Sequence, residues 1–325
     1  MTGKRGDWEP LEFEGLKTTS LKDRQSKVRV EDFGRPWEPG GSFAGFISGL
    51  PGILAAGEFR EAVAAIAGAV REERTVLLGM GAHPIKVGLN PILIDGFKRG
   101  VFAGLALNGA GVIHDVEVAL AGKTSEDVAA HLDCGQFGTA RETAEFIHGA
   151  AASAYKSGGV GFGTAVGRRL IEDGAPYAHL SLLATAAELG IPVTVHVAVG
   201  TDIIHMHPAM DGAAIGALSH YDFRLFCRLV STLGRGVYVN LGSAVILPEV
   251  FLKAVSVVRN LGYSLDGITT VNMDFQKHYR ALVNVVQRPT AGTGKGITLI
   301  GHHEIMFPLL MAAVVERIAG EASDG

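Results

Sequence analysis

The sequence has few of the patterns that mark disulfide-rich, metal-thiolate or membrane-spanning proteins. Its 2 cysteines, Cys134 and Cys227, stand far apart, and neither belongs to a C-x-x-C pair. We therefore expect neither a disulfide framework nor a thiolate zinc site. No apolar run reaches membrane-spanning length, and no apolar stretch follows a basic start. The expected compartment is the cytoplasm.

The chain also has no large excess of positive or negative charge. The net charge is -4, and lysines and arginines are scattered rather than gathered on one helix. This pattern favours neither a nucleic acid nor a membrane as partner. Apolar residues, in contrast, make up 47% of the chain, and there are 44 glycines. That is enough for one large α/β domain or two smaller ones, with many turns.

Short apolar or β-branched runs alternate with helical patterns from residue 75 onward. This alternation predicts a doubly wound α/β fold, with a mostly parallel sheet and helices on both faces. Residues 1–41 are polar and rich in turn formers, so we expect an irregular N-terminal arm and a single domain over 42–325. The expected strands are 75–80, 101–107, 193–199, 237–241, 268–273 and 298–301.

Ligands of such sheets bind at the carboxyl ends of the strands. Here most of these ends carry glycine or another small residue, as a shared crevice requires. They are Gly79–Gly81, Asn108–Gly111, Gly200–Asp202, Gly242–Ala244, Asn272–Asp274 and Gly301–His303.

The stretch from Leu105 to Asp115 carries the most local information. An apolar strand enters a glycine turn at Asn108–Gly111, and a helix follows. The free N–H groups at such a helix start attract anions, phosphates above all. The full G-x-G-x-x-G spacing is missing. A bound phosphate and a tight turn without a guest both remain open.

Lys295 stands among glycines in the segment 290–296. The segment lacks the spacing of a phosphate loop. A lysine held away from water can act as a nucleophile and form an imine. The alternative is a solvated loop lysine.

Histidines and aspartates concentrate between His196 and His220. Zinc or iron could be bound by such residues, but no H-E-x-x-H motif completes a site. In the other interpretation, each histidine simply forms hydrogen bonds with its own neighbours and binds no metal. His302 follows the last strand and is a crevice candidate, whereas Glu304 more readily caps the last helix.

Taken in order, these motifs resemble deoxyhypusine synthase and its relatives. Segments 78–88 and 108–115 look like the two NAD loops of that family, and Gly294-Lys295-Gly296 looks like the segment with its imine-forming lysine. The family's paired glutamates are replaced here by Ile113 and His114. The resemblance implies a parallel-sheet NAD-binding fold, a homotetramer, and a divergent member that is not a true deoxyhypusine synthase.

The same resemblance implies an NAD-dependent transferase that couples hydride transfer to a lysine imine on a small-molecule substrate. Lys295 would be the nucleophile, with His205 or His114 as proton shuttles. Other hypotheses are a metal-dependent hydrolase built on the His196–His220 cluster and a non-catalytic nucleotide-binding protein. The residues expected to contact NAD are Gly79, Gly81, Ala82, His83, Lys86, Asn108, Gly109, Ala110, Gly111, Asp115, Asp202, Asn272, Met273 and His302.

Overall fold

The computed structural model describes residues 9–322 and is built around one six-stranded parallel sheet. The strand order is β3-β2-β1-β4-β5-β6, so the direction of winding reverses between β1 and β4. A doubly wound, parallel α/β fold is thereby confirmed. The strands are β1 Val76–Met80, β2 Gly104–Asn108, β3 Val193–His196, β4 Val237–Leu241, β5 Thr269–Asp274 and β6 Lys295–Ile300.

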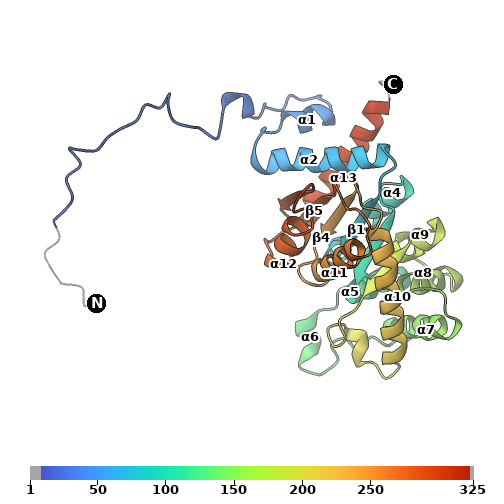
Figure 1. Ribbon diagram of the computed structural model, residues 1–325. Coiled ribbons are helices and arrows are strands. Elements are labelled where there is room, and N and C mark those ends of the chain that lie inside the picture. Colours follow the sequence, from blue (N-terminus) through green and yellow to red (C-terminus); the bar gives the residue numbers. More distant parts are fainter. Residues whose placement is uncertain (1–8, 323–325) are drawn as a thin grey trace.

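Helices connect the strands and cover both faces of the sheet (Figure 1). They are α1 Phe43–Gly49, α2 Leu54–Arg71, α3 His83–Lys86, α4 Asn90–Lys98, α5 Gly109–Ala121, α6 Val128–Leu132, α7 Arg141–Ser157, α8 Phe162–Glu172, α9 Leu182–Leu189, α10 Gly212–Val230, α11 Ile246–Asn260, α12 Tyr279–Ala281 and α13 His303–Ala322. Short 3-10 turns lie at Val30–Asp32, Ala178–Leu180 and Ile203–Met206, and a π-helix at Leu282–Gln287.

Alternate side chains of each strand point to opposite faces, and each face has its own core. Leu78 and Met80 pack with α2, α4, α5 and α13 on one face. Leu77 and Tyr238 pack with α10 and α11 on the other. Since β1 is buried on both faces, its continuous apolar sequence is the one that a central parallel strand needs.

The strand register aligns the carboxyl ends of neighbouring strands. Met80 of β1 pairs with Leu107 of β2 and with Leu241 of β4, and Asp274 of β5 pairs with Ile300 of β6. The carboxyl ends of all these strands therefore lie along one edge. Loops that leave this edge supply every polar group described below as a candidate site.

Residues 212–230 form the single helix α10. Helix α8 begins at Phe162, directly after the glycine-rich segment 157–161. The buried carboxylate of Asp222 accepts the main-chain N–H of Gly163 and thereby fixes the start of α8.

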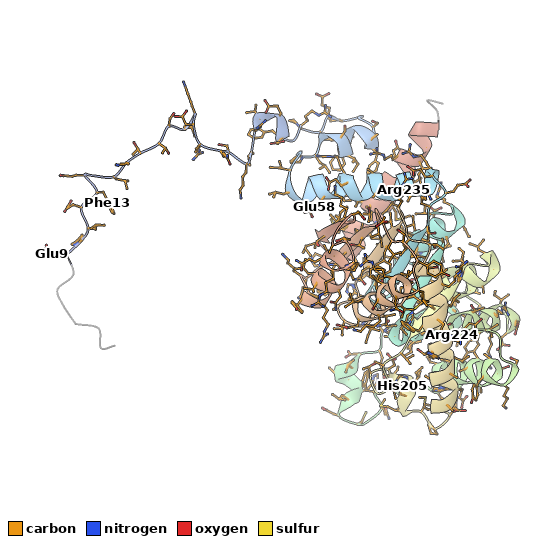
Figure 2. The ribbon with its side chains drawn as sticks, viewed as in Figure 1. Glu9, Phe13, Glu58, His205, Arg224 and Arg235 are labelled. Carbon is orange, nitrogen blue, oxygen red and sulfur yellow. The ribbon has the colours of Figure 1, made fainter. Side chains whose placement is uncertain are left out.

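The first described residues form the expected irregular arm, which extends away from the body (Figure 2, Phe13). Main-chain hydrogen bonds from Arg35 to Gly49 and from Gly52 to Asp32 attach its end to the α1 region. The Trp37 ring packs edge-on against Phe46 at 5.7 Å. Within 9–322, no helix is both long and apolar enough to cross a membrane.

Candidate functional site at the carboxyl edge of the sheet

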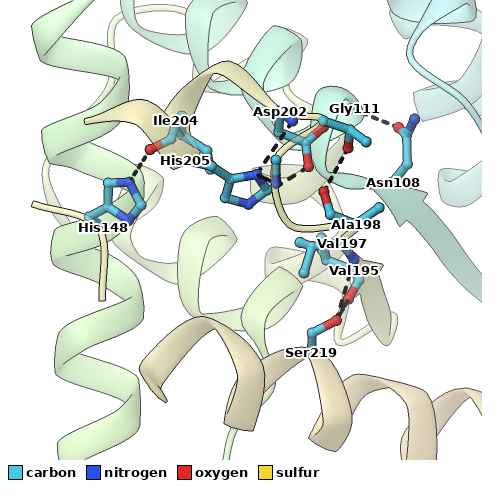
Figure 3. A network of polar contacts seen from close by, with 12 residues as sticks. Asn108, Gly111, His148, Val195, Val197, Ala198, Asp202, Ile204, His205 and Ser219 are labelled. Atoms are coloured by element: carbon cyan, nitrogen blue, oxygen red, sulfur yellow. Dashed lines mark hydrogen bonds and ion pairs between the residues drawn. The ribbon is translucent and has the colours of Figure 1, made fainter. Parts of the chain in front are cut away.

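The start of α5, where an anion was expected, holds the protein's own carboxylate. Asn108 caps the helix by accepting the main-chain N–H of Gly111 at 3.0 Å. The main-chain N–H of Ala110 is a polar neighbour of the carboxylate of Asp202. Asp202 itself arrives from the loop after β3 (Figure 3). A side chain on Gly109 would meet Oδ2 of Asp202 at 2.1 Å. The glycine turn is therefore needed for close approach, but the group that approaches is Asp202.

His205 holds Asp202 in this position. Nδ1 of His205 accepts the main-chain N–H groups of Gly200 at 3.1 Å and Asp202 at 3.4 Å, so the proton of the neutral ring is on Nε2. That nitrogen lies 3.9 Å from Oδ2 of Asp202. Burial raises the pKa of Asp202, while His205 and the Ala110 N–H oppose the shift. Within the described chain, neither Oδ2 of Asp202 nor Nε2 of His205 has a hydrogen-bond partner.

A cavity of about 160 Å³ opens beside Asp202. It brings together side chains that follow three neighbouring strands: Lys86 after β1, His114 in α5 after β2, and Asp202 after β3. Its volume is below the 300–1,000 Å³ of typical small-molecule sites. It can therefore hold one end of a dinucleotide and not the whole. The lining residues are Lys86, Ala110, Ile113, His114, Glu117, Ser125, Glu126, Val128, Phe137, Thr201, Asp202 and Ile203.

His114 is oriented within this cavity by a carboxylate. Thr124 Oγ1 lies 2.6 Å from Nδ1 of His114 and donates its own proton to Glu117. Nδ1 therefore carries a proton, and Nε2 is left for the cavity. Burial works against ionisation of Glu117, but hydrogen bonds from His114 and Thr124 outweigh it and lower the pKa of this carboxyl.

A second polar group lies at the other half of the edge, around the reversal point of the sheet. Nδ1 of His83, which begins α3, is 2.8 Å from Nδ1 of His303, which begins α13. Nε2 of His303 lies 3.9 Å from Oδ1 of Asp274 at the end of β5. His303 and Asp274 are buried, and burial is the main cause that lowers the pKa of His303. Asp274 and His303 were not among the residues expected to contact NAD, although both stand at strand ends.

Aromatic rings surround this pair. Phe275 lies 5.2 Å from the ring of His83, and His302 stacks on Phe275 at 6.4 Å. The His302 side chain is 71% exposed, so it lies at the rim. His278 approaches the second oxygen of Asp274 at 3.8 Å.

Four residues expected at the cofactor lie inside the protein instead. Gly79 is buried in β1, where a side chain would meet the Tyr238 hydroxyl at 2.1 Å. Asn272 accepts a hydrogen bond from Asn240 within the sheet, and Met273 is fully buried. The Asp115 carboxylate accepts hydrogen bonds from Asn90, Ser181 and the main chain at the start of α9. These positions support the edge from within.

Gly81 and Ala82 form the turn from β1 into α3. The main-chain N–H of Gly81 donates to Leu241, and a side chain there would meet the carbonyl of Gly242 at 2.4 Å. Gly81 therefore joins the two strands that flank the reversal point. Ala82 is half-buried just before His83.

Lys295 lies at the opposite edge of the sheet. It is the first residue of β6 and pairs in register with Thr269, the first residue of β5. Its side chain is 56% exposed, and its Nζ lies 2.9 Å from Oε1 of Glu61. Of the two alternatives for this lysine, the described chain shows the exposed one, because the side chain meets solvent and a strand length separates it from the carboxyl edge.

The histidines between 196 and 220 do not assemble into a metal centre. His196 bonds to Thr194, and burial lowers its pKa to about 4. His207 stacks on His148 at 6.1 Å. Across residues 9–322, no group of three or more histidine, cysteine, aspartate or glutamate side chains could hold a metal ion.

No protein-family model and no curated protein matches the chain. Solved structures do. A ternary complex of AgrE with ornithine and NAD+ matches with a TM-score of 0.55 and 12% identity, over 82% of this chain and 34% of that one. A protein from Entamoeba histolytica assigned as a deoxyhypusine synthase matches with a TM-score of 0.50 and 12% identity, over 86% and 95% of the two chains.

A LOR/SDH protein from Methanococcus maripaludis S2 matches with a TM-score of 0.50 and 16% identity, over 91% of this chain and 75% of that one. At such identities the likeness shows the fold alone. One of these structures, the match from Entamoeba histolytica, is assigned to the family that the sequence motifs resemble. The chain spans about a third of the length of AgrE.

Proposed function

We propose that the protein is an NAD-dependent enzyme of the deoxyhypusine synthase-like family, acting by hydride transfer on a small molecule. The observation that carries the proposal is the sheet order 3-2-1-4-5-6, with polar side chains collected along its carboxyl edge on both sides of the reversal point. Dinucleotides bind across that point in folds of this topology. The AgrE structure, which contains NAD+, supports the same choice of cofactor.

In this proposal the adenosine half occupies the cavity beside Asp202. Asp202 lines the cavity, and its carboxylate is the kind of acceptor that a ribose hydroxyl needs, although Oδ2 itself is buried and has no hydrogen-bond partner among the described residues. Carboxylates have this role in NAD-binding folds of the same topology. Lys86, exposed at the mouth of the cavity, supplies a positive charge for the pyrophosphate. His114 offers Nε2 to the nucleotide, whereas His205 keeps Asp202 in place. The phosphates do not rest on the start of α5, because Asn108 already accepts the N–H group of Gly111 there and the carboxylate of Asp202 lies beside the N–H group of Ala110.

Isothermal titration calorimetry with NAD+ and NADH tests the proposal. We expect binding by the unmodified protein at millimolar ligand or below. Asp202→Asn should weaken it about tenfold, because one hydrogen bond to a charged acceptor contributes roughly 1.5 kcal/mol. Asp211→Asn is the matched control, since Asp211 also follows β3 but caps the start of α10 in solvent. Absence of binding by the unmodified protein would refute the cofactor assignment.

A dinucleotide-binding protein without turnover is the second candidate. The placement of Lys295 favours it, because the nucleophile expected for an imine lies a strand length from the crevice. NAD+ that binds but is never reduced by any cell extract or small-molecule pool would support this candidate.

We further propose that the chain forms a homotetramer, as the resemblance implies. The exposed apolar side chains of the arm support a packing partner, among them Leu11, Phe13, Leu16 and Leu21. Light scattering measures the mass of the assembly formed by the full chain and by a chain that begins at residue 30. We expect a tetramer for the full chain and a smaller assembly for the shortened one. A monomer at micromolar concentration would contradict the tetramer.

A further inference from the structure

We propose that Asp274, His303 and His83 form a proton relay that ends at Nε2 of His83 and makes this nitrogen the proton acceptor of the crevice. The proposal rests on the hydride-transfer function proposed above. Two protons decide it: the one shared by the Nδ1 atoms of His83 and His303, and the one on Nε2 of His303.

The contact between the two imidazoles requires one shared proton. With Nδ1 atoms 2.8 Å apart, one ring must donate and the other accept. If His303 donated, its Nε2 would present a lone pair to the buried Asp274 carboxylate. If His83 donates, Nε2 of His303 carries a proton that points toward Asp274 Oδ1, 3.9 Å away. The second arrangement is favoured, because the first would place the lone pair of Nε2 against the negative charge of Asp274 in a buried site, where little water is present to screen the repulsion.

The surroundings of His303 favour the same arrangement. Its ring is buried, and among the described residues Nε2 has no hydrogen-bond partner that meets normal geometry. Burial, helped by His83, lowers the pKa of His303 against the opposing effects of Asp274, Met273 and Glu304, so the ring is neutral and carries a single proton. Gly242 permits this packing, because a side chain on it would meet Cε1 of His303 at 2.8 Å. Its φ of +63° also suits glycine.

His83 is then left with an unprotonated Nε2. The ring is half-buried, it follows β1 directly, and it lies next to Phe275 at the reversal point of the sheet. When this nitrogen accepts a proton, the positive charge can be stabilised through His303 by Asp274. His83 is thus the catalytic group of the proposal, and His303 and Asp274 are positioning residues.

The reaction step suits a substrate with a hydroxyl or amino group on a carbon that also bears hydrogen. If NAD+ were bound as proposed above, it would supply the acceptor for the C–H hydrogen, which would leave as hydride with two electrons. The O–H or N–H proton would go to Nε2 of His83, and the bond between carbon and oxygen or nitrogen would become double. His83 would then return the proton to water.

Nuclear magnetic resonance of the full chain with ¹⁵N-histidine tests the relay without any substrate. Two-bond ¹H–¹⁵N spectra distinguish the tautomers, and His83→Gln and His303→Gln assign the signals. We expect His83 with its proton on Nδ1 and His303 with its proton on Nε2. Asp274→Asn should shift His83 toward the Nε2-protonated tautomer, although Asp274 is not hydrogen-bonded to His83. Glu316→Gln is the matched control, because this exposed carboxylate belongs to the same helix α13 and is not among the groups that act on His303.

Unmodified protein with the proton of His83 on Nε2 would overturn the relay, even if Asp274→Asn failed to fold. A His83 tautomer that ignores Asp274→Asn in a folded variant would leave a structural histidine pair and also overturn it. Diethyl pyrocarbonate then tests the location. It should modify Nε2 of His83, and saturating NAD+ should slow the modification at least fivefold. If calorimetry shows NAD+ binding without this protection, the relay lies outside the crevice and fails alone. If NAD+ does not bind, the proposed function fails, and the spectra still decide the relay.

Discussion

Oδ2 of Asp202 lies so close to Gly109 that a methyl group on this glycine would be 2.1 Å from it. Gly109→Ala therefore forces the Asp202 carboxylate away from the start of α5. We expect a loss of about 1–3 kcal/mol in the free energy of unfolding, the usual cost of overpacking. Urea denaturation measures it. Gly216→Ala, in α10 with nothing within 4 Å, is the control and should be neutral or stabilising. An equal response of both variants would contradict the close contact.

Asp115 should contribute to the free energy of unfolding, because its carboxylate is buried and accepts several hydrogen bonds. It accepts hydrogen bonds from Ser181 and from the main-chain N–H groups of Leu182 and Leu183. Burial raises its pKa to about 6 against these hydrogen bonds. Asp115→Ala should cost about 3 kcal/mol, since buried donors lose their acceptor. Asp211→Ala removes an exposed cap and should cost about 1 kcal/mol. Thermal unfolding of both variants compares them, and a smaller loss for Asp115→Ala would oppose the assignment.

Asp222 should make stability fall as the pH rises. Burial raises its pKa from 3.8 to about 7, against main-chain hydrogen bonds from Val195, Gly163 and Phe162. Between pH 4 and 7 the folded state therefore holds a proton that the unfolded state has released, and each increase in pH favours unfolding. From pH 5 to 7 the unmodified protein should lose about 2 kcal/mol relative to Asp222→Asn. Denaturation at both pH values measures the difference, and a constant difference would refute the raised pKa.

Lys295 should be dispensable for binding at the carboxyl edge. Its ion pair with Glu61 is exposed, so Lys295→Ala should change the free energy of unfolding by less than about 1 kcal/mol. We expect unchanged NAD+ binding by calorimetry. Borohydride trapping with carbonyl compounds, followed by peptide mapping, should not label Lys295 selectively over Lys98, an exposed lysine at the end of α4. Selective labelling would place this lysine in a reactive site that the single chain does not form.

The sequence predicted the strands well because their signal is local. The segment 237–241 was expected as a strand and is β4, and the segment expected over 75–80 contains β1. Apolar runs between turn formers suffice for such predictions. The doubly wound, parallel class came from the alternation rule and the resemblance. Strand order follows from contacts between residues far apart in the chain, and the sequence did not predict it.

The site was predicted less well because its chemistry depends on distant partners. Asn108–Gly111 was recognised as a helix start with free N–H groups, but nothing in that stretch reveals that Asp202 reaches it. Asp115 and Asn272 have the side chains of ligand-binding residues, and burial alone assigns them to the interior. His303 was expected only as the end of the segment Gly301–His303, and nothing in the sequence reveals its contact with His83, 220 positions away.

The arm decides what an optical measurement of this protein reports. Both tryptophans of the chain, Trp8 and Trp37, stand within the first 41 residues. Trp8 falls outside the described residues, and Trp37 packs on Phe46 at the arm's attachment to α1. Tryptophan emission will therefore follow detachment or docking of the arm, while the sheet can unfold unseen. Tyr238, stacked on Phe251 at 3.8 Å inside the core, makes near-ultraviolet circular dichroism the better signal for the sheet itself.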